Sequence, residues 1–144
     1  MKKCSDIMTR ELVFCSPQDT IVEVAQLMKR EDIGPVLIVD NPESRTLVGI
    51  VTDRDLVIKV IAEGLDPQGT RVEQVMSKKL ITCGADDDVD VAMQAMAQFQ
   101  LRRIPVVEGA MKLVGIISQA DVATRADAPQ KTAEVVKEIS QPET

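Results

Sequence analysis

Two segments of the sequence pair a hydroxyl side chain with an aspartate three residues later. GIVTDRDL (49–56) and GIISQADV (115–122) both run glycine, two aliphatic residues, Thr or Ser, two variable residues, Asp and an aliphatic residue. At a helix N-terminus such a pair can form a capping box. The hydroxyl then accepts from the third helical amide and the carboxylate accepts from the amide of the capping residue. With capping alone, loss of the hydroxyl costs about 1 kcal/mol of stability.

The same atoms can also hold a ligand. A helix N-terminus presents free amides and positive partial charge, which suit a phosphate. A Thr or Ser hydroxyl can donate to a phosphate oxygen, and an ionised carboxylate, which only accepts, suits the two hydroxyls of a ribose. The residue types alone favour capping over ligand binding, and both interpretations stay open at this point.

The composition excludes several kinds of chemistry. The chain has 144 residues, of which 44% are hydrophobic and 28% charged, so a soluble globular protein is expected. It has no His, which removes His-based triads and His-ligated metals, so we expect neither catalytic nor metal-binding residues. It has no Trp or Tyr and a net charge of −6, which disfavours nucleic acid and anionic membranes as partners.

The segments outside the motifs indicate a cytoplasmic protein. The first residues lack the apolar core of a signal peptide, and no run of 18 apolar residues predicts a membrane span. Three cysteines, Cys4, Cys15 and Cys83, show no CxxC spacing and are expected to be free thiols.

The chain contains an internal duplication. MTRELVFC (8–15) matches MSKKLITC (76–83) at an offset of 68 residues, and LVGIV (47–51) matches LVGII (113–117) at an offset of 66. A loop two residues longer in the first copy accounts for the change of offset. Because the matches keep register across several elements, we infer two homologous repeats.

Each repeat predicts the order strand, helix, strand, strand, helix, an α+β fold. Aliphatic residues at i, i+3, i+4 and i+7 start at Ile21 and at Val89 and predict one helix in each repeat. We assign residues 1–66 to the first repeat, 67–126 to the second, and 127–144 to a tail that is consistent with a short helix. Because about 60 residues is marginal for a lone domain, we expect the two βαββα repeats to pack around a pseudo-twofold axis.

The order of elements, the doubled motif and the lead-ins DIMT and QVMS resemble the cystathionine β-synthase (CBS) domain. A tandem pair of these domains is called a Bateman module. The resemblance covers roughly residues 4–125, and VTDRDLVIK followed by GLDP is most similar to stand-alone bacterial CBS-pair proteins. It implies a regulatory module that binds an adenosyl nucleotide (AMP, ADP, ATP, NAD or similar) in the cleft between the repeats. It further implies a homodimer that relays binding to a partner protein.

The resemblance also implies roles for particular residues. Asp55 and Asp121 would hold the ribose, and Thr52 and Ser118 would reach the phosphate. The residues expected near phosphate through their charge are Arg54, Arg102 and Arg103. The adenine would lie in an aliphatic slot formed by Cys15, Pro17, Ile33, Thr82, Ala85, Ile104 and Pro105. The competing interpretation for each Arg is that it is a solvent-exposed surface charge without a ligand. For each residue of the slot, it is that the side chain only packs in the core.

The two candidate sites differ in charge. Arg102–Arg103 precede the strand IPVV in the second repeat, where the first repeat has Gly34–Pro35. Asp53, beside Thr52, would repel a phosphate in the first repeat. Cys15 and Cys83 occupy equivalent positions in the two repeats. Both are consistent with small buried hydrophobic residues. They could also form a disulfide if the pseudo-twofold axis brings them together.

Two other classes of function remain. A ligand-independent dimeric interaction or stress-response protein would use the duplicated fold as a scaffold only, and thiol sensitivity is compatible with this class. An enzyme is disfavoured because the sequence offers no nucleophile–base pair.

Overall fold

The chain forms two compact units. A computed structural model describes residues 2–125, and the prediction of a short helix in the tail lies outside them. The first unit consists of residues 13–80, and the second unit combines residues 2–12 with residues 81–125. Both units mix helices with a three-stranded sheet, so the predicted α+β class is confirmed.

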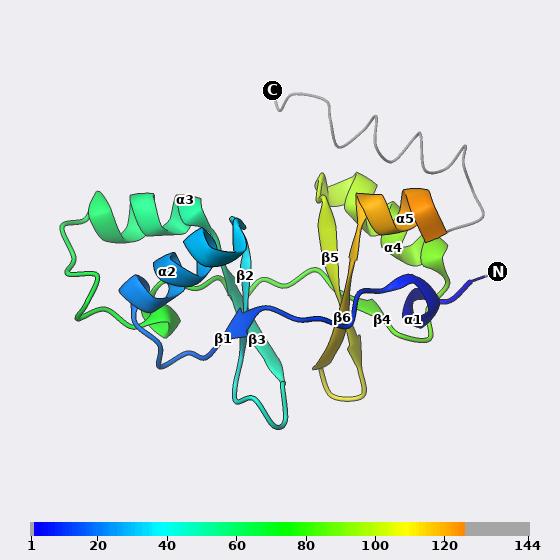
Figure 1. Ribbon diagram of the computed structural model, residues 1–144, viewed down its shortest axis with the longest axis horizontal. Helices are drawn as coiled ribbons and strands as arrows, with labels where there is room; N and C mark the ends of the chain where they lie inside the picture. The colour runs from blue at the N-terminus through cyan, green and yellow to red at the C-terminus, as the bar shows by residue number, and fades with distance from the viewer. Residues whose placement is uncertain (1, 126–144) are drawn as a thin grey trace. The chain divides into compact units, whose positions relative to one another are not determined.

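The first unit follows the predicted order of elements. Its elements are β1 (Phe14–Cys15), α2 (Ile21–Glu31), β2 (Val36–Val39), β3 (Leu47–Val51), α3 (Asp53–Asp55), the π-helix η1 (Leu56–Ile61) and the 3₁₀-helix η2 (Val72–Gln74). Strand β1 pairs parallel to β2, and β2 pairs antiparallel to β3 (Figure 1). Gly64 has φ 72° and closes the helical segment after η1, as its sequence position predicts.

The second unit repeats this topology. Its elements are α1 (Cys4–Ile7), β4 (Cys83–Gly84), α4 (Val89–Phe99), β5 (Arg103–Glu108), β6 (Lys112–Ser118) and α5 (Gln119–Arg125). Strand β4 pairs parallel to β5, and β5 pairs antiparallel to β6 (Figure 1). The central strand of each sheet carries a register shift at the same place, Ile38/Val39 and Val106/Val107.

The duplication extends to unusual backbone conformations. Helices α2 and α4 both end in a left-handed non-glycine residue, Asp32 (φ 53°) and Gln100 (φ 55°). The hairpin loops each hold another, Arg45 (φ 53°) and Met111 (φ 66°). Left-handed conformations are uncommon for residues other than glycine. Their recurrence at equivalent positions therefore indicates that the two repeats have the same local backbone conformation.

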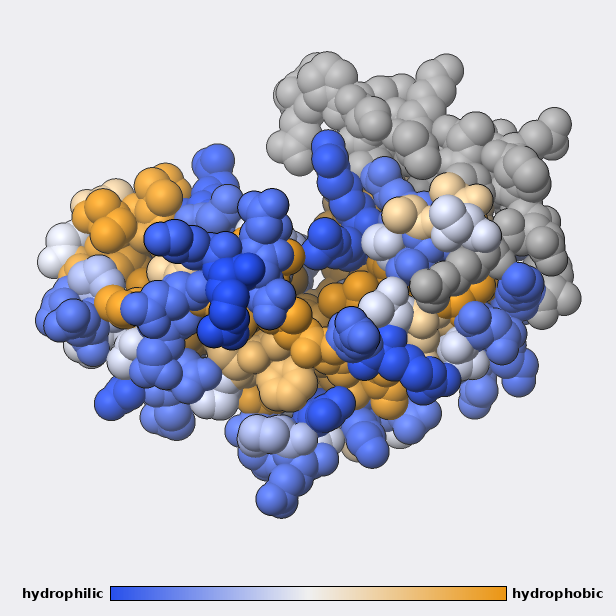
Figure 2. All heavy atoms as spheres, viewed as in Figure 1, coloured by the Kyte–Doolittle hydropathy of each residue, from blue (hydrophilic) through white to orange (hydrophobic). Residues whose placement is uncertain are grey.

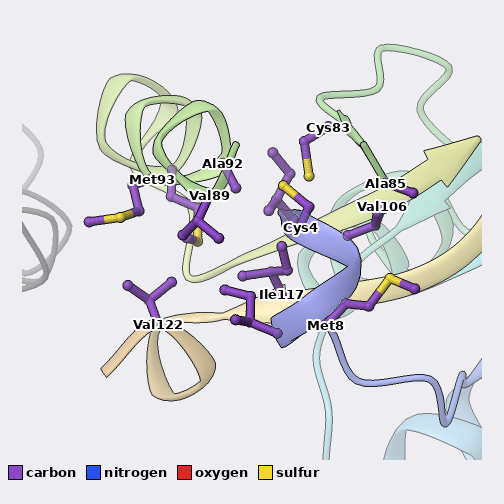
Figure 3. Close-up of a cluster of buried hydrophobic side chains, with 13 residues drawn as sticks. Cys4, Met8, Cys83, Ala85, Val89, Ala92, Met93, Val106, Ile117 and Val122 are labelled. Atoms are coloured by element: carbon purple, nitrogen blue, oxygen red, sulfur yellow. The ribbon is translucent and has the colours of Figure 1, made fainter. Parts of the chain in front are cut away.

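Each unit has its own apolar core. In the first unit, Ile21, Val24 and Met28 of α2 pack with β2 and β3, as the helical stripe predicts, whereas Ala25 of that stripe is exposed. In the second unit, α4 presents its stripe to β5 and β6. Figure 3 shows this cluster, whose members include Val89, Ala92, Met93, Val106, Ile117 and Val122.

The lead-in of each repeat packs onto the motif glycine of the other repeat. Met8 lies against Gly115, and the backbone of Thr9 exchanges two hydrogen bonds with Ile116 (2.8 and 3.0 Å). Met76 likewise lies against Gly49, and Ser77 exchanges two hydrogen bonds with Ile50 (3.0 and 2.8 Å). The compact units therefore group the chain differently from the sequence repeats 1–66 and 67–126, because each repeat donates its lead-in.

Several predicted elements differ in extent from the structure. Of ELVFC (11–15) only Phe14–Cys15 is a strand, and of KLITC (79–83) only Cys83 is, in a strand that continues to Gly84. The helix α1 was not predicted, because four residues are too few for a periodic pattern. Across the described part of the chain, helices are too short or too polar to cross a membrane.

Candidate functional site

The first hydroxyl–carboxylate pair lies at the end of β3 and forms a capping box. The amide of Thr52 donates to Asp55 Oδ2 (2.9 Å), and the amide of Asp55 donates to Thr52 Oγ1 (3.3 Å). Lys59, one turn further on, makes an ion pair with Asp55 Oδ1 (3.2 Å). Strand β3 fixes the hydroxyl, and the first turn of α3 fixes the carboxylate. Capping at this site is therefore confirmed.

The second pair has the same geometry at the end of β6. The amide of Ser118 donates to Asp121 Oδ2 (2.9 Å), and the amide of Asp121 donates to Ser118 Oγ (3.2 Å). Asp121 is only 8% exposed, and Thr9 Oγ1 lies 3.5 Å from both of its carboxylate oxygens. A capping hydroxyl uses a lone pair and keeps its O–H as a donor, and a carboxylate has about four acceptor positions. Capping and ligand binding are thus compatible.

The residues beside the two pairs carry different charges. Arg103 is the cross-strand partner of Ser118, and the carbonyl of Arg102 accepts from the Gln119 amide (3.0 Å). Both arginine side chains are exposed. In the first unit, a Cβ added to Gly34 would lie 3.2 Å from Asp53 Oδ1, so an exposed carboxylate occupies the corresponding place. The predicted asymmetry in local charge is present, and Arg54 is an exposed side chain in the first unit.

Three neighbours of the motifs were not predicted from sequence. They are Lys59 beside Asp55, Thr9 beside Asp121, and Gln119, whose Nε2 is buried and makes no hydrogen bond within the described residues. A signal existed for Thr9, because DIMT and QVMS both place a hydroxyl residue after the methionine. A buried amide without a partner is costly, so Gln119 marks a position where an acceptor would be favourable.

The residues predicted for the adenine slot are mostly buried in the two cores. Cys15, Ala85, Ile104 and Pro105 are buried, whereas Pro17, Ile33 and Thr82 are half-buried. Cys15 belongs to the core of the first unit, and Ala85 and Ile104 to that of the second. Core packing thus accounts for the buried members, and their part in an adenine slot stays a prediction.

The cysteines are free and buried, as expected for small hydrophobic residues. Cys15 lies in the first unit, where burial, followed by the carboxylates of Asp19 and Glu23, raises the pKa of its thiol to about 12. Cys83 lies in the second unit, in the same core cluster as Cys4. Within residues 2–125 no group of three or more Cys, Asp or Glu side chains is arranged to hold a metal ion.

Comparison with known proteins places this architecture in a family. The CBS domain model matches residues 4–62 and 72–127. The CBS domain-containing protein YhcV of Bacillus subtilis is 36% identical over 140 residues, which cover 97% of this chain and 96% of YhcV.

Two crystal structures have the same fold. Hypoxic Response Protein I with two coordinated zinc ions superposes with a TM-score of 0.75 at 32% identity, covering 85% of this chain and 98% of that one. The CBS domain pair of MJ0100 in complex with 5′-methylthioadenosine and S-adenosyl-L-methionine superposes with a TM-score of 0.67 at 27% identity, covering 85% and 94%. The chain therefore belongs to the CBS domain family and carries two CBS domains in tandem.

Proposed function

We propose that the protein is a regulatory module that binds an adenosyl nucleotide at its hydroxyl–carboxylate pairs and relays binding to a partner protein. The observation that carries the proposal is the recurrence of one capped pair at the end of β3 and of β6, each with a hydroxyl donor and a carboxylate acceptor fixed by backbone hydrogen bonds. The MJ0100 domain pair, which binds two adenosyl compounds, supports this class of ligand.

The second unit is the better candidate for the phosphate end of the ligand. Arg102 and Arg103 stand next to Ser118 and Gln119, and guanidinium groups bind phosphate oxygens through two parallel hydrogen bonds. The buried Gln119 amide would gain an acceptor there. In the first unit the Asp53 carboxylate would repel a phosphate. We therefore propose that Thr52 and Asp55 bind a part of the ligand that carries no phosphate, or bind a nucleotide with lower affinity than the second unit does.

A thermal-shift panel tests the proposal. AMP has about 23 non-hydrogen atoms. A binding free energy of about −0.3 kcal/mol per atom gives a dissociation constant of roughly 10 μM. At a ligand concentration about a hundred times the dissociation constant, the folded state is stabilised by about 2.7 kcal/mol. For a chain of this size the melting temperature then rises by roughly 5–10 °C.

The panel includes AMP, ATP, NAD, S-adenosylmethionine, 5′-methylthioadenosine and inorganic phosphate. We expect the phosphorylated nucleotides to raise the melting temperature more than 5′-methylthioadenosine, because of the two arginines. A melting temperature that no adenosyl compound changes would contradict the proposal. That outcome would favour the alternative, a ligand-independent interaction or stress-response protein whose carboxylates serve as caps only.

We further propose a homodimer. The exposed apolar side chains Val57 (56%), Ile58 (49%) and Ile61 (63%) gather on η1, where Figure 2 shows a hydrophobic patch over this helix. Clusters of this kind mark interaction surfaces. Sedimentation equilibrium should give about twice the chain mass of 15.8 kDa, and Ile61→Asp should shift the equilibrium toward the monomer. A monomer mass at all concentrations would refute the dimer.

The remaining proposals concern activity and location. We propose that the module has no catalytic activity of its own, since neither candidate site offers a nucleophile with an adjacent base. Free thiols are typical of a reducing compartment, and we propose the cytoplasm.

A further inference from the structure

Two of the three cysteines meet in the core of the second unit. Cys4 comes from α1 and Cys83 from β4, 79 positions later in the chain, and both are almost fully buried (0% and 3% exposed). Both side chains belong to the same buried cluster, and Figure 3 shows their sulfur atoms pointing toward each other. Cys4 Sγ also lies 3.6 Å from the Asp88 carbonyl, and Cys83 Sγ lies 3.8 Å from the Pro105 carbonyl.

A few backbone hydrogen bonds hold the segment that carries Cys4 against residues 85–89 of the same unit, one of them from the Val89 amide to the Lys2 carbonyl (3.0 Å). The Cys4 amide donates to the Asp87 carbonyl (2.8 Å), and the Ser5 amide donates to the Ala85 carbonyl (3.0 Å). Helix α1 has only four residues, of which Cys4 and Ile7 are buried and Asp6 is exposed. A four-residue helix held by a few hydrogen bonds opens locally at lower free-energy cost than a strand of the sheet, so Cys4 is the thiol that reaches solvent on local opening.

The two thiols differ in acidity. The pKa of Cys4 is lowered, because the neighbouring Cys83 thiol can donate to the Cys4 thiolate. The pKa of Cys83 is raised by its interaction with Cys4 and by burial. The thiolate is the nucleophilic form of cysteine, which makes Cys4 the attacking sulfur and Cys83 the resolving one.

We propose that Cys4 and Cys83 are an oxidisable dithiol, and that their disulfide fixes the segment 2–9 to the sheet of the second unit. The oxidant is a peroxide. The Cys4 thiolate attacks hydrogen peroxide, the O–O bond breaks, and Cys4 becomes a sulfenic acid while hydroxide leaves and takes up a proton as water. When the segment closes again, Cys83 sulfur attacks the Cys4 sulfenic acid. The S–S bond forms, the S–O bond breaks, and a second water leaves.

The consequence of the bond lies at the other end of the same segment. Met8 packs against Gly115, and Thr9 pairs with Ile116 and places its hydroxyl 3.5 Å from the Asp121 carboxylate oxygens. A covalent link at Cys4 keeps this segment in place, because the opening that frees Cys4 also loosens Met8 and Thr9. The disulfide would therefore hold Thr9 on Asp121. This inference needs no nucleotide and stands independently of the proposed ligand.

Mass spectrometry of the full chain tests the inference. The reduced protein is treated with hydrogen peroxide, denatured, alkylated with iodoacetamide and digested with trypsin. Cleavage after Lys and Arg places the cysteines in different peptides, Cys4 in 4–10, Cys15 in 11–29 and Cys83 in 80–102. We expect two of the three thiols to be lost, a dithiothreitol-sensitive peptide that joins 4–10 to 80–102, and Cys15 alkylated.

Variants and hydrogen exchange complete the test. Cys15→Ser should form the same linked peptide, and Cys4→Ser should not. The amides of residues 4–9 should exchange more slowly in the oxidised chain than in the reduced chain. Recovery of all three thiols, a link that involves Cys15, or oxidation of Cys4 to a sulfinic acid without a link would each overturn the dithiol. Unchanged exchange in the linked protein would overturn the role of the bond in fixing the segment.

Discussion

Ile104→Ala should lower the free energy of unfolding by about 2–5 kcal/mol, the range for removing a large aliphatic side chain from a packed core. Ile104 lies on β5, is 0% exposed, and belongs to the apolar cluster that joins the sheet of the second unit to α4. The substitution leaves a cavity that neighbouring strands cannot fill, because Pro105 and Val106 are held by the pairing with β6. Urea unfolding followed by circular dichroism measures the change, since the chain has no Trp or Tyr for fluorescence.

Ile104→Val is the matched control and should cost about 0.5–1.5 kcal/mol, because it removes one methyl group. Equal losses for the two variants, or a loss below 1 kcal/mol for the alanine, would contradict the placement of Ile104 in the core. Such a result would favour a surface role in the adenine slot.

Gly115→Ala should destabilise the second unit by about 1–3 kcal/mol, the cost of overpacking a well-packed site. An added Cβ would lie 2.7 Å from Met8 Cγ and 3.0 Å from Met8 Cβ, and it would also meet the Met8 sulfur. Met8 is itself buried, so its side chain cannot swing into solvent to make room. The motif glycine is thus required by the lead-in methionine that packs on it.

A double-mutant cycle separates this explanation from a general intolerance of alanine on β6. In a Met8→Ala background the clashing sulfur and Cγ are gone, and Gly115→Ala should cost less, by about 0.5 kcal/mol or more. Thermal unfolding of the four proteins measures the coupling. Costs that are the same in both backgrounds would show that Met8 is not the obstacle.

Local features of the fold were predictable because they depend on neighbours in the sequence. The capping boxes at Thr52 and Ser118 follow from a hydroxyl three residues before a carboxylate, and the structure has both. The stripe that begins at Ile21 gave α2, and Thr20 caps it by accepting from the Glu23 amide (3.2 Å). Short-range rules of spacing are sufficient for such elements.

Long-range features were not predictable in the same way. The lead-in Met8–Thr9 packs on β6 at Gly115 and Ile116, about 107 residues further along the chain. No local pattern encodes that pairing, although the DIMT and QVMS repeat marked the residues. The contact of Cys4 with Cys83 was missed for the same reason, and sequence equivalence pointed instead to Cys15 and Cys83.

The candidate site is intermediate between these cases. The residue types predicted the two pairs and the difference in charge between Arg102–Arg103 and Gly34–Pro35. The structure adds a different partner for each carboxylate. Lys59 makes an ion pair with Asp55, and the Thr9 hydroxyl lies beside Asp121. Lys59 follows Asp55 by four residues, a local spacing that sequence can indicate, whereas Thr9 lies 112 residues before Asp121 and no local pattern specifies that contact.

Isothermal titration calorimetry with the adenine nucleotide that gives the largest thermal shift is the most direct test of the proposed function. It compares the unmodified chain with Asp121→Ala and with Thr20→Ala, which removes a helix cap of similar strength away from the paired motifs. Loss of hydrogen bonds to a charged group should weaken binding by about tenfold or more in Asp121→Ala, and Thr20→Ala should bind like the unmodified chain. Equal affinity in all three proteins would mean that Asp121 is a helix cap and nothing more.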